Sequence, residues 1–159
     1  MREMIVPKLM QDLQIDERGY PIPYFVPFVN GKPNFKYQDA KKKEICRKYM
    51  KCHICGNRLF DKSFWFICGP LGYLNHVSSD EAMHEDCARF SMKYCPHLVN
   101  LKAERKVTEG ALGGQLDYKP DRLFLVKADK LFFIGSVHTK FRIKETHSFH
   151  YVENKLVPL

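Results

Sequence analysis

Four residues in the middle of the chain have the types and spacing of a metal site. Cys52 and Cys55 are separated by two residues and followed by Gly56, and His84 and Cys87 are also separated by two. A tight CxxCG turn can direct both sulfurs at one ion, with glycine taking the backbone angle that a side chain would resist. Residues three apart share a helix face, so His84 and Cys87 can reach the same ion. We therefore expect one tetrahedral Zn²⁺ site, structural rather than catalytic because four protein ligands fill it.

The other cysteines leave one alternative open. Cys95 lies eight residues after Cys87, directly before Pro96, and could replace one of the four ligands. Cys46 and Cys68 are expected in the core. Six cysteines in 159 residues are sparser than in a secreted disulfide scaffold, so the sequence favours a reducing compartment and a metal.

The elements that must position these ligands predict an α+β fold in three parts. Residues 1–37 contain five prolines with aromatic residues between them, which predicts an extended arm, with a short hairpin turn at Asn30-Gly31. Residues 38–98 are expected to form a helix and a zinc finger. Residues 99–159 are expected to form a linker and an antiparallel β-meander, packed with the finger as one compact domain.

The finger itself follows the order of a treble clef. A basic helix from Asp39, its expected N-cap, to about Met50 leads into the CxxC knuckle. Residues 59–69 are expected to form a hairpin with its turn at Asp61-Lys62-Ser63, and a helix then donates the last two ligands. His53, inside the knuckle, is expected to point into solvent.

The C-terminal part alternates short apolar runs with turn residues. Strands are expected at 122–127, 131–134, 137–143 and 148–152. The turns between the first three are expected at Ala128-Asp129-Lys130 and at Gly135-Ser136.

A series of motifs resembles an uncharacterised family of bacterial and phage proteins. The shared pattern is CxxCG, FxxGP, HxxCA and CPxL, and it is carried here by Cys52 to Gly56, Phe66 to Pro70, His84 to Ala88 and Cys95 to Leu98. Ala82 and Met83 stand where a proline is common in that family. The resemblance implies a zinc-binding protein of phage or prophage type in the cytoplasm of a bacterial host cell. It implies no activity.

The charge of the chain points to anionic partners. Its formal net charge is +8, and cations cluster on the helix before the finger and after the finger. If the fold joins them beside an exposed Tyr49 or Trp65, the surface would suit phosphate contacts with base stacking. The expected nucleic-acid-binding residues are Lys41, Lys42, Lys43, Arg47, Lys48, Lys51, Lys102, Arg105 and Lys106.

Two other functions remain open. The proline-aromatic arm and the edges of the sheet suit strand addition to a protein partner, such as a host complex that the chain inhibits or modulates. An HNH-like metal-dependent nuclease would use His76 as its general base, although the further residues of that site are missing from the sequence. No run of residues is long and apolar enough for a membrane span. Because the further residues of a nuclease site are missing, the sequence favours a binding module over an enzyme.

Overall fold

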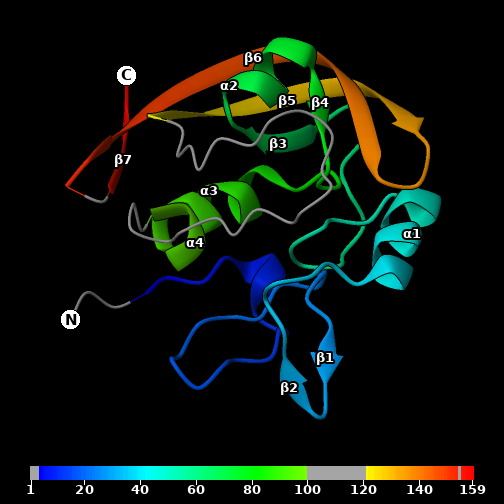
Figure 1. Cartoon of the computed structure of the whole chain (residues 1–159), viewed down its shortest axis with the longest axis vertical. Helices are drawn as coiled ribbons and strands as arrows, with labels where there is room; N and C mark the ends of the chain where they lie inside the picture. The colour runs from blue at the N-terminus through cyan, green and yellow to red at the C-terminus, as the bar shows by residue number, and fades with distance from the viewer. Residues whose placement is uncertain (1–3, 100–120, 154) are drawn as a thin grey trace, which may run out of the picture.

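A curled antiparallel sheet lies over two helices, and the N-terminal segment (residues 4–37) lies on the far side of those helices (Figure 1). The structure is a computed structural model and describes residues 4–99, 121–153 and 155–159. Under the sheet lie α3 (Glu85–Tyr94) and α4 (Pro96–Val99), and α1 (Ala40–Tyr49) lies beside the curled end of the sheet. The mixed α+β class expected from the sequence is confirmed.

The sheet is built around two long paired strands, at residues 122–134 and 138–152. Its strands run in the order β3-β5-β6-β4, with β7 also paired to β6, and every pairing is antiparallel. The strands are β3 (Phe64–Cys68), β4 (Val77–Ser78), β5 (Arg122–Ile134), β6 (His138–Val152) and β7 (Lys155–Pro158). The short α2 (Pro70–Asn75) packs on one face, where Tyr73 stacks on Phe124 with ring centroids 4.1 Å apart.

The expected turn at Ala128-Asp129-Lys130 is wrong. Residues 122–134 form one strand, β5, and the pairing with β6 changes register at Lys127/Ala128 and at Ala128/Lys130. Bulges of this kind bend and twist a strand without ending it. The bulge also turns Asp129 toward β6, where Arg142 donates to both of its carboxylate oxygens at 2.8 Å. Four expected strands are therefore two, joined by the turn expected at Gly135-Ser136.

Of the hairpin expected between the two ligand pairs, the structure contains the turn but not two paired strands. Phe60 and Ser63 form an isolated bridge around Lys62, which has a φ of 54°. The strand that follows, β3, pairs along its whole length with β5 instead of folding back on residues 59–60. The cause is burial: Phe66 is fully buried and stacks on Phe141 of β6 with centroids 4.3 Å apart.

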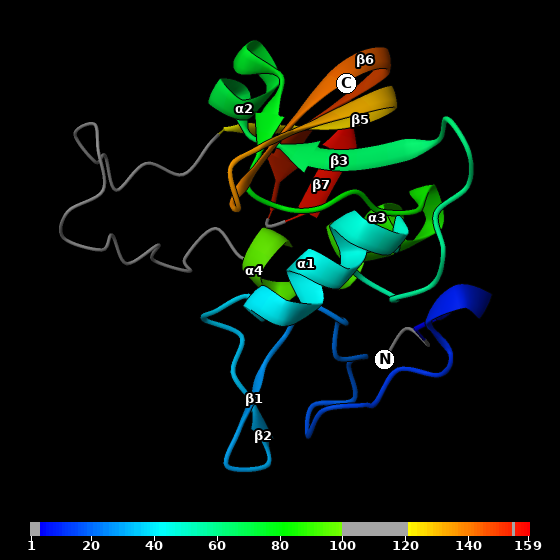
Figure 2. The same ribbon diagram turned by 90° about the vertical axis from the view of Figure 1, so that its right-hand side faces the viewer.

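The expected helix before the knuckle and the expected hairpin in the N-terminal part are both confirmed. The Asp39 side chain caps α1 by accepting from the backbone N–H groups of Lys41 and Lys42. Asn30 and Gly31, both with positive φ, turn the chain between β1 (Phe28–Val29) and β2 (Lys32–Pro33), which project from the body in Figure 2.

The N-terminal segment is nevertheless part of the core. Met10, Ile22 and Val26 are buried. The backbone N–H groups of Tyr24 and Phe25 donate to the carbonyl groups of Ile54 and His53 at 2.7 and 3.2 Å. The segment thus covers the CxxC knuckle.

A buried carboxylate joins α1 to the tip of the β5–β6 hairpin. Glu81, whose side chain is 3% exposed, accepts from Arg47 Nε at 2.8 Å and lies 3.3 Å from Lys43 Nζ and from Thr139 Oγ1. Arg47 also donates to the backbone carbonyl groups of Gly135 at 2.6 Å and His138 at 2.9 Å. Glu81 therefore neutralises two inward cations and holds the hairpin against the helix.

Substitution of Glu81 tests this network. Glu81→Ala leaves the Lys43 and Arg47 charges without their partner, and we expect a loss of about 3–5 kcal/mol in the free energy of unfolding measured with urea. Glu145→Ala, which removes an exposed carboxylate paired with His147, should cost less than about 1 kcal/mol. Equal losses in the two variants would contradict the assigned role of Glu81.

Candidate metal centre

The four residues of the expected metal site come together in the interior. Their ligand atoms all lie within 4.8 Å of one another, and all four residues are buried. His84 Nδ1 is 3.3 Å from Cys55 Sγ and 3.9 Å from Cys87 Sγ. His84 is the residue before α3, and Cys87 lies in its first turn. This cluster could hold one metal ion.

Backbone amides of the knuckle point at the sulfurs. Cys52 Sγ accepts from the backbone N–H groups of Ile54, Cys55 and His84 at 3.4 to 3.5 Å, and Asn57 N–H donates to Cys55 Sγ at 3.4 Å. Hydrogen bonds to a charged acceptor are stronger than those between neutral groups, so these amides stabilise thiolates. The backbone of the turn therefore favours charged sulfurs at this site.

Gly56 is needed for this turn in two ways. Its φ is +75°, and a Cβ built on it would lie 2.7 Å from Cδ2 of Tyr24. The positive φ favours glycine at any turn of this type. The close approach of Tyr24 arises because the N-terminal segment covers the knuckle.

The orientation of His84 is fixed by a second hydrogen bond. Its Nε2 lies 2.7 Å from the backbone carbonyl oxygen of Arg58. A carbonyl oxygen only accepts, so Nε2 carries a proton, and Nδ1 is the ring nitrogen that faces the sulfurs and could bind an ion. A hydrogen bond on the other ring nitrogen is the usual partner of a metal-bound histidine.

The sulfurs and the imidazole of the cluster share protons through hydrogen bonds. Hydrogen bonds from the Cys52 and Cys87 thiols lower the pKa of Cys55. Burial lowers the pKa of His84, but hydrogen bonds to Cys52 and Cys55 outweigh it and raise that pKa to about 10. By contrast, burial raises the pKa values of Cys46 and Cys68 to about 12, which leaves both as thiols. A metal ion would replace the protons that the cluster shares.

The alternative ligand Cys95 lies outside the cluster. It ends α3 as the C-cap and is not among the four residues whose ligand atoms meet. All six cysteines are free of disulfides.

The expectation that His53 points into solvent is wrong. The residue is 1% exposed, and its ring stacks on Phe25 with centroids 4.3 Å apart. Its Nδ1 accepts from the backbone N–H of Glu81 at 3.2 Å. Burial lowers the pKa of His53, which favours the neutral ring. The N-terminal segment and the Glu81 loop enclose the knuckle from both sides, and local spacing alone gives no sign of either contact.

Only some of the cations expected on the basic surface of α1 are exposed to solvent. Lys43 is buried and binds Glu81 and the carbonyl oxygen of Ser79, and Arg47 binds Glu81 and the hairpin. Lys42 Nζ lies over the rings of Tyr24 and Phe28 at 5.3 and 5.7 Å.

The remaining expected cations are exposed or lie outside the described residues. Lys41 and Lys48 are exposed and Lys51 is half-buried. Lys102, Arg105 and Lys106 fall outside the described residues. Of the two rings proposed for stacking, Tyr49 is 55% exposed, but Trp65 is 2% exposed and cannot serve.

A basic surface that the sequence analysis missed lies on the β5–β6 hairpin. Lys130 pairs across the strands with Arg142, and Phe132 pairs with Lys140. All four side chains are exposed, and we call them the hairpin basic face. Lys144, 58% exposed, lies beside it, 4.0 Å from Asp129. The signal in the sequence is the alternation of polar and apolar residues over 138–143, which places Lys140 and Arg142 on one face of a strand.

The candidate general base of a nuclease stands apart from the cluster. His76 is exposed and ends α2 with a φ of 55°, and its ring lies parallel to that of Phe141 at 6.4 Å. Within residues 4–99, 121–153 and 155–159, the only group of three or more potential metal ligands is the Cys/His cluster.

Comparisons with protein-family models, with curated proteins and with solved structures each gave no match. Among the described residues, no helix has the length and hydrophobicity needed to cross a membrane.

Loss of one ligand should abolish metal binding. Cys87→Ser removes a thiolate, and because metal binding in such sites contributes on the order of 10 kcal/mol to folding, we expect a metal-free and largely unfolded chain. Cys95→Ser should keep stoichiometric metal by elemental analysis and the circular dichroism of the parent. Metal retained in Cys87→Ser, or lost in Cys95→Ser, would show that the ligand set is different.

The two roles of Gly56 can be separated by a matched pair of alanine variants. Gly135 also has a positive φ, +58°, but a Cβ there would meet nothing within 4 Å. We expect Gly135→Ala to cost about 1 kcal/mol in urea unfolding, and Gly56→Ala to cost distinctly more because Tyr24 must move. Equal costs would show that Tyr24 does not restrict this position.

Proposed function

We propose that the chain is a zinc-stabilised nucleic-acid-binding protein of phage or prophage type. The single observation that supports nucleic acid best is the hairpin basic face, where cations and an exposed aromatic ring alternate on two paired strands. The CxxCG, FxxGP, HxxCA and CPxL motifs support the phage origin and a place in the bacterial cytoplasm.

The donor set supports zinc as the metal. Three sulfurs and one imidazole nitrogen in a closed, buried, four-residue cluster are typical of structural Zn²⁺. The order of knuckle, strand and helix-borne ligands supports a treble-clef finger. In this proposal the ion holds the knuckle to α3, and no chemistry takes place on it.

The geometry of the hairpin basic face suits single strands. Lys130 Nζ lies 5.2 Å from the centre of the Phe132 ring, so a cation and a stacking platform are adjacent. Arg142 is bound to Asp129, which leaves Lys130 and Lys140 as the cations best placed for phosphate groups. Exposed aromatic rings flanked by cations bind unpaired bases and the backbone with little sequence preference.

A protein partner is the second candidate. Ile134 and Val137 at the hairpin tip are 49% and 50% exposed, next to the hairpin basic face. Apolar residues at an exposed tip suit a protein contact. For the nuclease alternative, plasmid nicking in Mg²⁺ that is unchanged in His76→Ala would exclude His76 as the base.

The proposal is tested by the salt dependence of binding. We expect fluorescence anisotropy to show binding of the metal-loaded protein to single-stranded DNA at low salt. Lys130→Ala/Lys140→Ala should weaken this binding at least tenfold and reduce the slope of log K against log salt by about 0.7 per lost phosphate contact. Phe132→Ala should cost a further 1–3 kcal/mol, roughly, if a base stacks on the ring.

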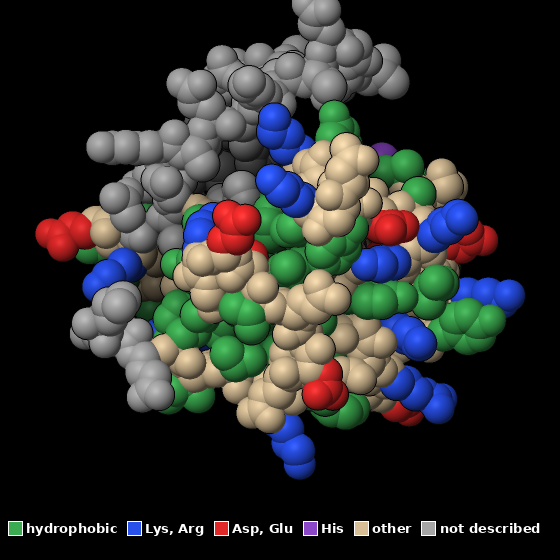
Figure 3. All heavy atoms as spheres, turned by 90° about the horizontal axis from the view of Figure 1, so that it is seen from below, with side chains coloured by type: hydrophobic (Ala, Val, Ile, Leu, Met, Phe, Trp, Pro, Cys, Tyr) green, Lys and Arg blue, Asp and Glu red, His purple; other side chains and the backbone are tan. Residues whose placement is uncertain are grey.

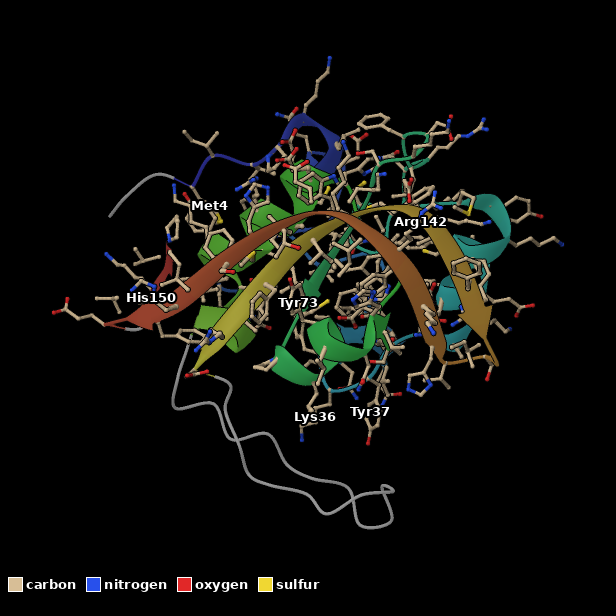
Figure 4. All side chains as sticks on the ribbon, turned by 90° about the horizontal axis from the view of Figure 1, so that it is seen from above. Met4, Lys36, Tyr37, Tyr73, Arg142 and His150 are labelled. Atoms are coloured by element: carbon tan, nitrogen blue, oxygen red, sulfur yellow. The ribbon has the colours of Figure 1, made fainter. Side chains whose placement is uncertain are left out.

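The control carries the same change of charge elsewhere. Lys8 and Lys36 are exposed on the N-terminal segment, and Figure 4 shows Lys36 well away from Arg142. Lys8→Ala/Lys36→Ala should bind nearly as the parent does. A hairpin variant no weaker than this control, or a parent that does not bind at low salt, would overturn the proposal.

A further inference from the structure

A cavity of about 270 Å³ lies between the N-terminal segment, the knuckle and the α3–α4 pair. This volume is close to the lower end of the ~300–1,000 Å³ typical of ligand pockets. Hydrophobic side chains gather on this side of the molecule, which Figure 3 shows from below. The cavity shares no residue with the hairpin basic face or the metal cluster.

The walls of the cavity are mostly apolar. The N-terminal segment contributes aromatic rings and prolines, and the helices contribute further rings and a leucine. These wall residues include Tyr20, Pro21, Phe35, Phe90, Tyr94 and Leu98. Walls of this kind suit a planar ring held by stacking and apolar contact.

One polar atom at the cavity lacks a partner. His53 lines the cavity, and because its Nδ1 accepts from the Glu81 N–H, its proton is on Nε2. Nε2 is buried and has no hydrogen-bond partner among the described residues. Buried donors are almost always satisfied, and leaving one unpaired destabilises the folded state. The unpaired Nε2–H therefore points to a missing acceptor.

A carboxylate stands beside this donor. Asp80 also lines the cavity, and its Oδ1 is 3.9 Å from His53 Nε2, beyond hydrogen-bond distance. Gln38 donates to the same oxygen at 2.7 Å, which fixes the carboxylate in place. A donor and an acceptor thus lie side by side at the edge of an apolar cavity, at a spacing that two neighbouring atoms of one ligand can bridge.

We propose that this cavity binds a nucleobase-like heterocycle. A ring acceptor takes the Nε2–H of His53, a neighbouring ring or exocyclic N–H donates to Asp80, and the ring plane lies between the aromatic and proline walls. Proteins that hold a single base combine edge hydrogen bonds with stacking in this way. Arg18, the cation of the cavity wall, is already paired with Asp16 at 2.9 Å, so recognition is of the base and not of a phosphate.

The ligand could come from two sources with the same chemistry. It is either a free nucleoside or nucleotide, or a base unstacked from a strand. The test titrates the ¹⁵N-labelled, metal-loaded full chain with each of the four ribonucleosides, with the matching 5′-monophosphates and with a short single-stranded oligonucleotide. Amide shifts of Asp80, Ser91 and Tyr94 report on the cavity.

We expect saturable shifts of these amides with at least one nucleoside or with the oligonucleotide, and similar affinities for a nucleoside and its monophosphate. His53→Asn keeps an acceptor for the Glu81 N–H, but its shorter side chain places no donor at the position of Nε2, and it should weaken binding about tenfold or more. Asp80→Asn, which removes the charged acceptor at a partly exposed site, is the second variant and should also weaken binding. His76→Asn is the matched control, because asparagine tolerates the positive φ of that exposed position.

The outcomes are distinct. Shifts with nucleosides alone assign a small-molecule ligand, and shifts with the oligonucleotide alone assign a base of a strand. The proposal is overturned if neither probe at millimolar concentration moves the cavity amides, or if His53→Asn and Asp80→Asn both bind as His76→Asn does. Lys130→Ala/Lys140→Ala should leave nucleoside binding unchanged, so failure at the cavity and failure at the hairpin basic face are separable.

Discussion

The convergence of three sulfurs and one imidazole on a single point is the constraint on which the rest of the structure depends. Cys52 and Cys55 belong to a turn, and His84 and Cys87 belong to the start of α3, so the cluster fixes two segments about 30 residues apart. The backbone amides that point at Cys52 and Cys55 stabilise thiolates, which are the form of cysteine that could bind an ion.

The buried ion-pair network extends this order to the sheet. Glu81 lies three residues before His84, and its carboxylate receives Arg47 from α1 and Thr139 from β6. Buried charges require such partners, because an unpaired charge in the interior is costly. Lys43 and Arg47, which would ordinarily face solvent, point inward because both pair with the carboxylate of Glu81.

Local features could be predicted from the sequence, and features set by distant contacts could not. The ligand spacing, the Asp39 cap and the Asn30-Gly31 turn each depend on a few neighbouring residues, and all are present. The inward direction of Arg47 depends on Glu81, and the burial of His53 depends on the N-terminal segment. Composition carries no sign of such long-range contacts. Residues 128–130 have the composition of a turn, but they form a bulge within β5. The long β6 beside them pairs with β5 on both sides of the bulge, and the local sequence gives no sign of this pairing.

Glu81 contacts two regions with different parts of the same residue. Its carboxylate binds the cations of α1 and the hydroxyl group of Thr139, while its backbone N–H orients the imidazole of His53. A displacement of this residue therefore alters the hairpin and the cavity together. If one molecule binds at the hairpin and another in the cavity, and either binding event shifts Glu81, thermodynamic linkage requires that each molecule change the affinity for the other by the same factor.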